Sequence, residues 1–293
     1  ARRAMIRTAE ATLSCKFDGE PLIVGTSGRY EFRNKGIDIF LDALKQLAET
    51  DALDREVLVY ITVPSATTGP RKDLQAHLAD ENSPIDPKQN RFCTHYLEHP
   101  EWDQILNSIA GSVLANPSSK VKVVFVPTYL NGRDGIFDKS YYELLVGMDM
   151  TLFPSYYEPW GYTPLESTAF SVPTLTTTLA GFGLWAGSQG EHEGVTLVAR
   201  NDDNYAEAAR EIAKALLHFT KYTPQEVEIA RNAAAELSRT ALWSELYAAY
   251  EKVYSEAIER SVTRTNRAVL NDGGGATEQI NFVRQQLITE KPH

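Results

Sequence analysis

Short apolar runs alternate with segments of helical periodicity along most of the chain. The first run, Leu22–Gly25, indicates a buried strand. Residues 35–49 then repeat apolar positions on one face of a helix, with Asn34 as the expected cap. Further strands are predicted at 57–63, 121–126, 150–153, 174–176 and 195–198, and further helices at 103–115, 139–147 and 164–171. Strands that alternate with helices indicate a parallel sheet covered on both faces, which binds ligands beyond the carboxyl ends of its strands.

Two regions depart from this alternation. Residues 65–100 are polar, irregular and rich in Pro and His, and we expect them to form an insertion or a lid. Three long helical patterns follow the last strand, at 204–219, 224–239 and 242–261, and a Gly273–Gly275 break precedes a helical stretch at 277–288. We therefore expect an α/β fold, a doubly wound Rossmann-like parallel sheet with extra C-terminal helices, over residues 1–261. Residues 262–293 are expected to be a flexible tail with one terminal helix.

Composition and charge restrict the class of protein. The chain is 43% hydrophobic and 23% charged, as in ordinary globular proteins. Its formal net charge of −10 argues against a nucleic-acid partner, because phosphate binding needs clustered Lys and Arg. No apolar run approaches the ~20 residues of a membrane helix, so no membrane partner is expected. Cys15 and Cys93 form no disulfide framework, and neither they nor the histidines have metal-ligand spacing. We expect a cytoplasmic protein that needs no metal or cofactor.

A first candidate site segment, Gly28–Gly36, follows the first predicted strand directly. Its glycines let the backbone approach a ligand closely, and Arg29, Arg33 and Lys35 gather positive charge in an acidic chain. An Arg side chain binds a diphosphate with two parallel hydrogen bonds, and a Lys side chain acts as a point charge. Taken alone, such a run is more often a charged surface turn.

A second candidate segment, Tyr156–Glu166, runs from a predicted strand through a tight loop into a helix. We expect Thr163 to cap that helix and Pro164 to take its first position, so that N–H groups at the helix start form an anion site. Glu158 and Glu166 would flank the ligand. Glu166 also has a structural alternative, because Thr163-x-x-Glu166 matches a capping box. Glu158 lies between aromatic residues and has no evident structural task.

Together with Cys93–His95 and Phe153–Ser155, these segments resemble the glycogen synthases of the animal and fungal type, glycosyltransferase family 3. The likeness runs from about Gly28 to Trp243 and continues through Thr177–Gly183. It includes the Glu-x7-Glu pattern that retaining GT-B glycosyltransferases share. The resemblance implies a GT-B carboxyl-terminal domain that binds the donor, with the amino-terminal acceptor domain absent from this chain.

The resemblance also implies roles at the diphosphate of a nucleotide-sugar donor. Arg29 and Lys35 would hold the diphosphate and take part in catalysis. The amides of Gly161, Tyr162 and Thr163 would complete its cradle. No metal ion is implied, because these groups supply the positive charge.

The remaining implied roles concern the nucleoside and the sugar. Tyr141 would stack on the base, although the neighbouring Tyr142 is a competing candidate. Glu166 would face the ribose hydroxyls, and Glu158 would stabilise the positive charge that develops at the anomeric carbon of the transferred glucose. A family histidine just before the Phe-Pro-Ser strand is Asp149 here, which puts donor contacts on that side in question.

The implied reaction transfers glucose from a nucleotide sugar to the non-reducing end of an α-1,4-glucan such as glycogen, with retention of configuration. UDP-glucose is favoured as the donor, and ADP-glucose stays open. The expected partners are the nucleotide sugar, the glucan and the amino-terminal domain, and a homo-oligomer is compatible with the sequence. Two alternatives are another retaining GT-B glycosyltransferase and a non-catalytic nucleotide-sugar-binding module.

Overall fold

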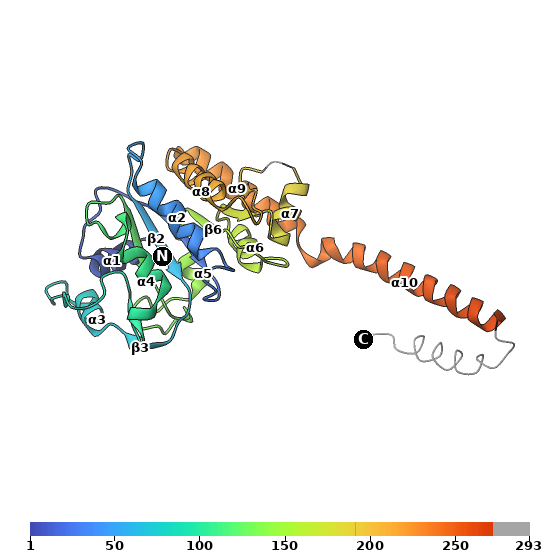
Figure 1. Cartoon of the computed structure of the whole chain (residues 1–293), viewed down its shortest axis with the longest axis horizontal. Coiled ribbons are helices and arrows are strands. Elements are labelled where there is room, and N and C mark those ends of the chain that lie inside the picture. The colour runs from blue at the N-terminus through green and yellow to red at the C-terminus, as the bar shows by residue number, and fades with distance from the viewer. Residues whose placement is uncertain (191, 272–293) are drawn as a thin grey trace. The chain divides into compact units, whose positions relative to one another are not determined.

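A computed structural model describes residues 1–190 and 192–271, and its main feature is a parallel sheet of six strands (Figure 1). The strand order is β5-β2-β1-β6-β7-β8. The strands are β1 (Leu22–Ser27), β2 (Val57–Thr62), β5 (Val121–Phe125), β6 (Met150–Phe153), β7 (Thr174–Thr177) and β8 (Val195–Val198). The order grows outward from β1 in both directions, so the switch point lies between β1 and β6. The predicted doubly wound α/β sheet is confirmed.

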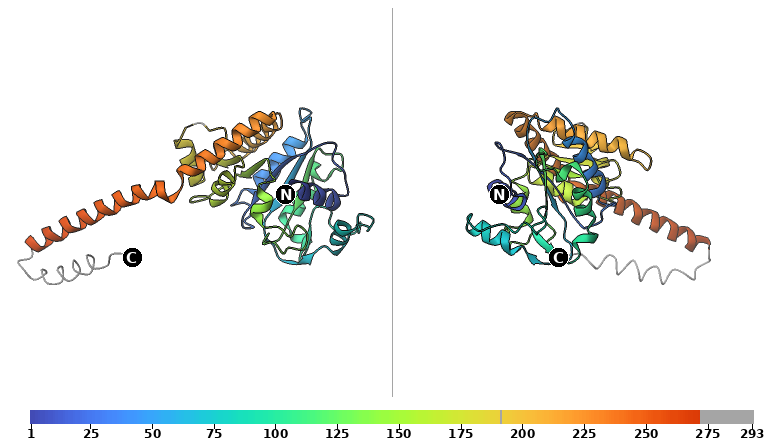
Figure 2. Two further views of the ribbon diagram at one scale, coloured as in Figure 1. Left: turned by 180° about the vertical axis from the view of Figure 1, so that it is seen from behind. Right: turned by 60° about the vertical axis from the view of Figure 1, so that its left-hand side comes forward.

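Helices cover both faces of the sheet (Figures 1 and 2). Successive residues of a strand point to opposite faces, so each face presents apolar side chains to a layer of helices. Val57, Val59 and Ile61 of β2 belong to a core shared with α2 (Ile37–Ala48), α4 (Gln104–Ala110) and α8 (Tyr205–Phe219). Leu58 and Tyr60 face the opposite core, which includes residues of α1 (Arg2–Leu13) and α5 (Tyr141–Leu145). A smaller cluster joins α7 (Gly181–Ser188) to α9 (Pro224–Thr240) and to residues next to and within α6 (Tyr162–Ala169).

The predicted insertion at 65–100 has a structure of its own. The strands β3 (Thr67–Pro70) and β4 (His95–Leu97) pair antiparallel, and they bracket α3 (Lys72–Ala79); the short 3-10 helices η1 (Pro100–Trp102) and η2 (Val113–Ala115) lie further along the chain. Arg71, which is 1% exposed, donates to both carboxylate oxygens of Asp73 at 3.1 and 2.6 Å and to the carbonyls of Asn90 and Cys93. A buried cation that uses its donors in this way ties the insertion together.

The boundary of the sheet domain differs from the expected one. The chain divides into two compact units, Ala1–Arg239 and Thr240–His293. The boundary thus follows Arg239, whereas the sequence predicts it after residue 261. The described part of the second unit is a helix, α10 (Trp243–Asn271), which continues past residue 261 into the stretch expected to be a flexible tail. The Gly273–Gly275 break and the terminal helix predicted at 277–288 lie outside the described residues.

Candidate functional site

A cleft of about 430 Å³ opens at the carboxyl end of β1, at the switch point of the sheet. Four of the predicted site residues line it: Arg29, Tyr141, Thr163 and Glu166. The rest of its wall comes from the ends of β1 and β2 and from the segment before α5: Ser27, Gly28, Tyr30, Thr62, Pro64, Thr128, Tyr129, Leu130 and Asn131. Residues from both candidate segments therefore meet at one cleft.

The two candidate segments are also joined to each other at this edge of the sheet. The Lys35 ammonium donates to the Glu158 carboxylate, and the two side chains are 17% and 21% exposed. The main chains are joined as well, because the Tyr156 N–H donates to the Asn34 carbonyl at 2.8 Å. The fold thus pairs a cation and a carboxylate that are 123 residues apart in sequence.

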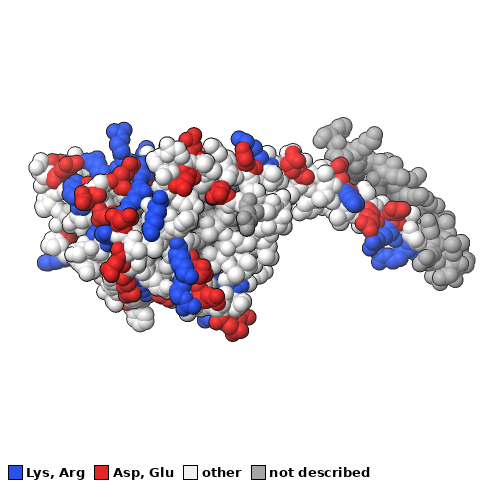
Figure 3. Space-filling view, turned by 90° about the horizontal axis from the view of Figure 1, so that it is seen from above, with Lys and Arg blue, Asp and Glu red and all other residues white. Residues whose placement is uncertain are grey.

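Arg29 is in a different environment from Lys35. Its side chain is 76% exposed and forms an ion pair with Glu31 at 2.8 Å. Water screens such a pair strongly, so little free energy is needed to separate it. Basic and acidic side chains are likewise interspersed on the face of the molecule that Figure 3 displays. The Arg29 guanidinium can therefore turn toward an anion in the cleft at small cost.

The start of α2 differs from the prediction. The cap is Gly36, with φ of 69°, and the Asn34 side chain donates instead to Glu31 at 2.6 Å. A Cβ atom on Gly36 would lie 2.6 Å from the carbonyl carbon of Pro154. The turn after β1 and the end of β6 therefore approach so closely that only glycine fits between them.

The start of α6 also differs from the prediction. The helix begins at Tyr162, two residues earlier than predicted, and Gly161 is the cap with φ of 111°. No side-chain cap hydrogen bond is made, so Thr163 and Glu166 do not form the predicted capping box. A glycine cap leaves the first N–H groups of the helix without a side-chain acceptor, which keeps them available to an anion.

The two adjacent tyrosines have distinct positions. Tyr141 lines the cleft and accepts a hydrogen bond from the Ser27 hydroxyl at 2.8 Å; burial raises its pKa to about 12, so it is a neutral phenol. Tyr142 is 42% exposed and is not among the residues that line the cleft. Of the two candidates for contact with a base, the geometry favours Tyr141.

Comparison with known proteins decides the family. A family model for glycogen synthase matches residues 75–292. This chain belongs to the glycogen synthase family. The glycogen [starch] synthase of Neurospora crassa is 28% identical over an aligned length of 305 residues, and the alignment covers 84% of this chain and 43% of that protein. The human liver glycogen [starch] synthase is 28% identical over an aligned length of 327 residues, and the alignment covers 92% of this chain and 46% of that protein.

The chain spans somewhat under half the length of these glycogen synthases. The human alignment covers 92% of the chain, which leaves at most about 23 of 293 residues outside it, so it includes the Gly28–Gly36 segment. Among solved structures, a glycosyltransferase from Rickettsia africae is 15% identical with a TM-score of 0.47, over 82% of this chain and 48% of that one.

Asp149, where the family has a histidine, lies away from the cleft. It precedes β6, at the amino end of the strands, whereas the cleft is at the carboxyl end. Its carboxylate accepts from Arg2 at 2.7 Å and from the Ile23 N–H at 2.8 Å, and Arg231 lies 3.7 Å away. Asp149 therefore ties α1 to the start of β1 and makes no direct contact in the cleft, so the question that it raised about donor contacts does not concern its own side chain.

Arg200 is a residue of this edge that the sequence patterns missed. It is 4% exposed, donates to the Pro154 carbonyl and lies over the Tyr156 ring, with its Cζ 5.2 Å from the centroid. Burial lowers the pKa of its guanidinium, which nevertheless stays charged. The Arg200 side chain thus supports the loop that ends at Glu158. No local signal marks it, because its partners are remote in sequence.

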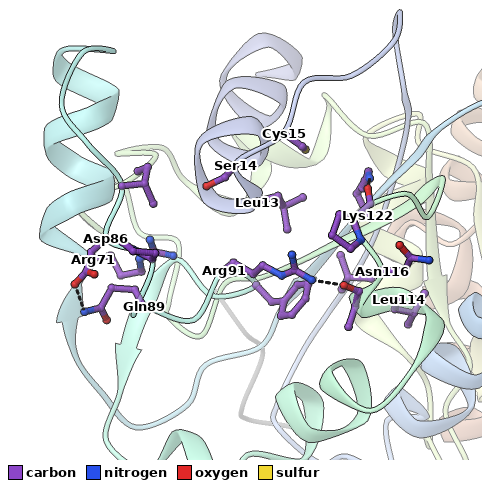
Figure 4. Close-up of a pocket in the computed structure, with 16 residues that line it drawn as sticks. Leu13, Ser14, Cys15, Arg71, Asp86, Gln89, Arg91, Leu114, Asn116 and Lys122 are labelled. Carbon is purple, nitrogen blue, oxygen red and sulfur yellow. Dashed lines mark hydrogen bonds between the residues drawn. The ribbon is translucent and has the colours of Figure 1, made fainter.

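A second cavity, of about 390 Å³, contains none of the predicted site residues (Figure 4). Three cations line it, and each donates to a main-chain carbonyl. Arg91 donates to Ala115, Lys122 donates to Pro117 at 2.5 Å, and Arg71 donates to Asn90 at 2.8 Å. These cations hold loops together, so we do not assign this cavity to an anionic ligand.

His95, which is part of the family resemblance, does not line the cleft. It is 3% exposed; Nε2 bonds the Asp134 carbonyl at 3.0 Å and Nδ1 bonds the Thr94 hydroxyl at 2.8 Å. Burial lowers its pKa, which keeps the imidazole neutral.

Across residues 1–190 and 192–271, no group of three or more His, Cys, Asp or Glu side chains is placed to hold a metal ion. Within the same ranges, no helix is long and apolar enough to cross a membrane.

Proposed function

We propose that this chain is the donor-binding part of a retaining glucosyltransferase that moves glucose from a nucleotide sugar to the non-reducing end of an α-1,4-glucan. The observation that carries the proposal is the Lys35–Glu158 pair at the switch point of the sheet. It brings together one cation and one carboxylate from the two segments that resemble the family's donor site. The match to the glycogen synthase family supports the same reaction.

In this proposal the nucleotide occupies the 430 Å³ cleft. The Tyr141 ring packs on the base, and Glu166 accepts hydrogen bonds from the ribose. Arg29 and the N–H groups of Gly161, Tyr162 and Thr163 bind the diphosphate, where the end of a helix favours negative charge. UDP-glucose is the favoured donor and ADP-glucose the alternative. Protein cations and amides supply the positive charge at the leaving diphosphate, so no metal ion is included.

Glu158 and Lys35 are the proposed catalytic residues beside the transferred glucose, together with Arg29 at the diphosphate. As the bond from the anomeric carbon to the diphosphate breaks, positive charge develops on the sugar and negative charge on the leaving oxygen. The Glu158 carboxylate stabilises the first, and the Lys35 ammonium stabilises the second. Because the two side chains are already paired and mostly shielded from water, little reorganisation accompanies the reaction.

The acceptor side of the cleft is proposed to come from a second domain. The chain spans under half the length of its curated relatives, and its described residues contain one parallel sheet of six strands, within the unit Ala1–Arg239. We therefore expect this chain to bind a nucleotide sugar with saturation but not to extend glycogen by itself. Titration calorimetry with UDP-glucose and ADP-glucose, beside a glucose-incorporation assay, tests both parts.

The outcomes separate the alternatives. Binding of either donor by this chain, with glycogen elongation only by a longer form of the protein, supports the proposal. Robust incorporation by the 293 residues alone would show that no second domain is needed. Donor turnover onto other acceptors but not onto glycogen would indicate a different retaining glycosyltransferase. Binding without turnover in the longer form would indicate a non-catalytic module.

Arg29→Ala and Lys35→Ala are each expected to weaken nucleotide binding by about 1.5–3 kcal/mol, the size of a hydrogen bond to a charged group. Calorimetry with the same nucleotide measures the change. Arg260→Ala is the matched control, because Arg260 is 74% exposed and also ion-paired, with Glu256 at 2.5 Å, but it lies on α10. Unchanged affinity in both variants would mean that neither cation binds the diphosphate.

A further inference from the structure

Tyr142 reaches from α5 to the side of α6 and contacts it twice. Its phenol O–H donates to Oε1 of Glu166 at 3.0 Å. Its ring stacks on Phe170, with centroids 5.0 Å apart and planes inclined by 11°. The Tyr141 ring also contacts it, with centroids 5.4 Å apart and an interplanar angle of 61°. The Tyr142 ring is thus in contact with two other rings, and its hydroxyl donates to the carboxylate.

Glu166 and Tyr142 differ in their position relative to the cleft. Glu166 lines the cleft, whereas Tyr142 does not. Among the described residues, the Tyr142 hydroxyl is the sole hydrogen-bond donor to the Glu166 carboxylate, and it occupies Oε1. The hydrogen bond to the carboxylate also raises the pKa of Tyr142, so the phenol keeps the proton that it donates. Oε2 of Glu166 has no protein donor among these residues.

We propose that Tyr142 is a positioning residue, which holds Oε1 of Glu166 so that Oε2 faces the hydroxyl groups of a bound ribose. A carboxylate only accepts hydrogen bonds, and the two adjacent hydroxyls of ribose are donors. A glutamate side chain fixed at one oxygen loses less conformational freedom when the ligand binds. Tyr142 then determines how strongly the site prefers a ribonucleotide to a deoxyribonucleotide. The inference rests on the proposed function, since it assumes a nucleotide in this cleft.

The test compares Tyr142→Phe with the unchanged chain, using UDP, ADP and the 2′-deoxy and 3′-deoxy forms of each. Phenylalanine keeps the stack on Phe170 and removes only the hydroxyl. We expect the affinity for the ribonucleotide to fall about fivefold to tenfold, or about 1–1.4 kcal/mol, because the lost hydrogen bond only orients Glu166 and the bonds from the ribose to that carboxylate are kept. The affinity for a deoxynucleotide that lacks the contacted hydroxyl should change little, so the preference for ribose should shrink.

Two controls separate positioning from general damage. Tyr205→Phe removes another phenol that donates to a carboxylate, Asp42 at 2.8 Å between α8 and α2, and it should leave both affinities unchanged. In a Glu166→Ala background, Tyr142→Phe should have no further effect, because the tyrosine acts through that glutamate. Thermal unfolding of each variant shows whether the fold is intact.

The possible failures are distinguishable. If the unchanged chain binds none of the nucleotides, the proposed function is wrong, and the inference about Tyr142, which depends on it, is wrong as well. If the unchanged chain binds nucleotides but Tyr142→Phe keeps the same preference for ribose, the proposed function stands and the role of Tyr142 is wrong. An equal loss for ribo- and deoxyribonucleotides would also overturn it, because a purely structural defect weakens both alike.

Discussion

Glu158→Gln is expected to abolish glucosyl transfer by the elongating form of the enzyme while nucleotide binding stays nearly intact. Glutamine keeps the size of the side chain and its hydrogen bond to Lys35, but it removes the negative charge. That charge is needed only when positive charge develops at the anomeric carbon, so its loss affects the transition state far more than the bound donor. Removing one such electrostatic group typically costs about 10²–10³ in kcat.

Glucose incorporation into glycogen measures the loss of turnover, and calorimetric titration with the donor measures whether the binding affinity is kept. Glu211→Gln is the matched control, because Glu211 also pairs with a lysine, Lys214 at 2.7 Å, but lies on α8. It should change neither turnover nor affinity. Full turnover by Glu158→Gln would show that the carboxylate does not act at the anomeric carbon. The ion pair with Lys35 would then be only a link between two loops.

Gly36→Ala is expected to destabilise the sheet domain by about 4 kcal/mol or more, an unusually large effect for one methyl group. Two costs add at this position. The φ of 69° is a left-handed conformation that alanine adopts poorly. The new Cβ would also lie 2.6 Å from the Pro154 carbonyl carbon and 3.2 Å from the Arg200 guanidinium. The carbonyl is main chain and Arg200 is buried, so neither can move aside easily.

Gly19→Ala separates these two costs. Gly19 also has a positive φ, 91°, but a Cβ there would meet no atom within 4 Å. Its replacement should therefore cost only the conformational part, about 1–2 kcal/mol. Urea unfolding midpoints of the two variants give the comparison. Equal losses in both would mean that the turn after β1 and the end of β6 can separate at little cost, which would contradict the close approach.

The close approach at Gly36 also connects stability with the proposed chemistry. The same contact brings Lys35 beside Glu158, because Lys35 directly precedes Gly36 and the loop after Pro154 leads to Glu158. Arg200 donates to the Pro154 carbonyl from a third segment. The position of the proposed catalytic pair is therefore set by packing of the main chain, which is more rigid than contact between two long side chains.

The sequence by itself determined the class of fold and the segments of the candidate site. Apolar strand runs are short and local, so their alternation with helical patterns predicted the parallel sheet, and the edge of the sheet where ligands bind followed from it. The Gly28–Gly36 and Tyr156–Glu166 strings carried the likeness to glycogen synthases because they are contiguous. The caps, in contrast, were misplaced at both helices, where Asn34 and Thr163 are plausible caps by residue type alone.

Only the tertiary structure decided how these parts meet. Gly36 and Gly161 cap their helices because the chain must turn there in left-handed conformations, and at Gly36 a segment remote in sequence also presses against the turn. Likewise, no local pattern indicates that Lys35 pairs with Glu158, or that Tyr142 supports Glu166 from outside the cleft. Such contacts depend on the distance between elements that are far apart in the chain, and that distance is fixed only when the sheet and its helices pack.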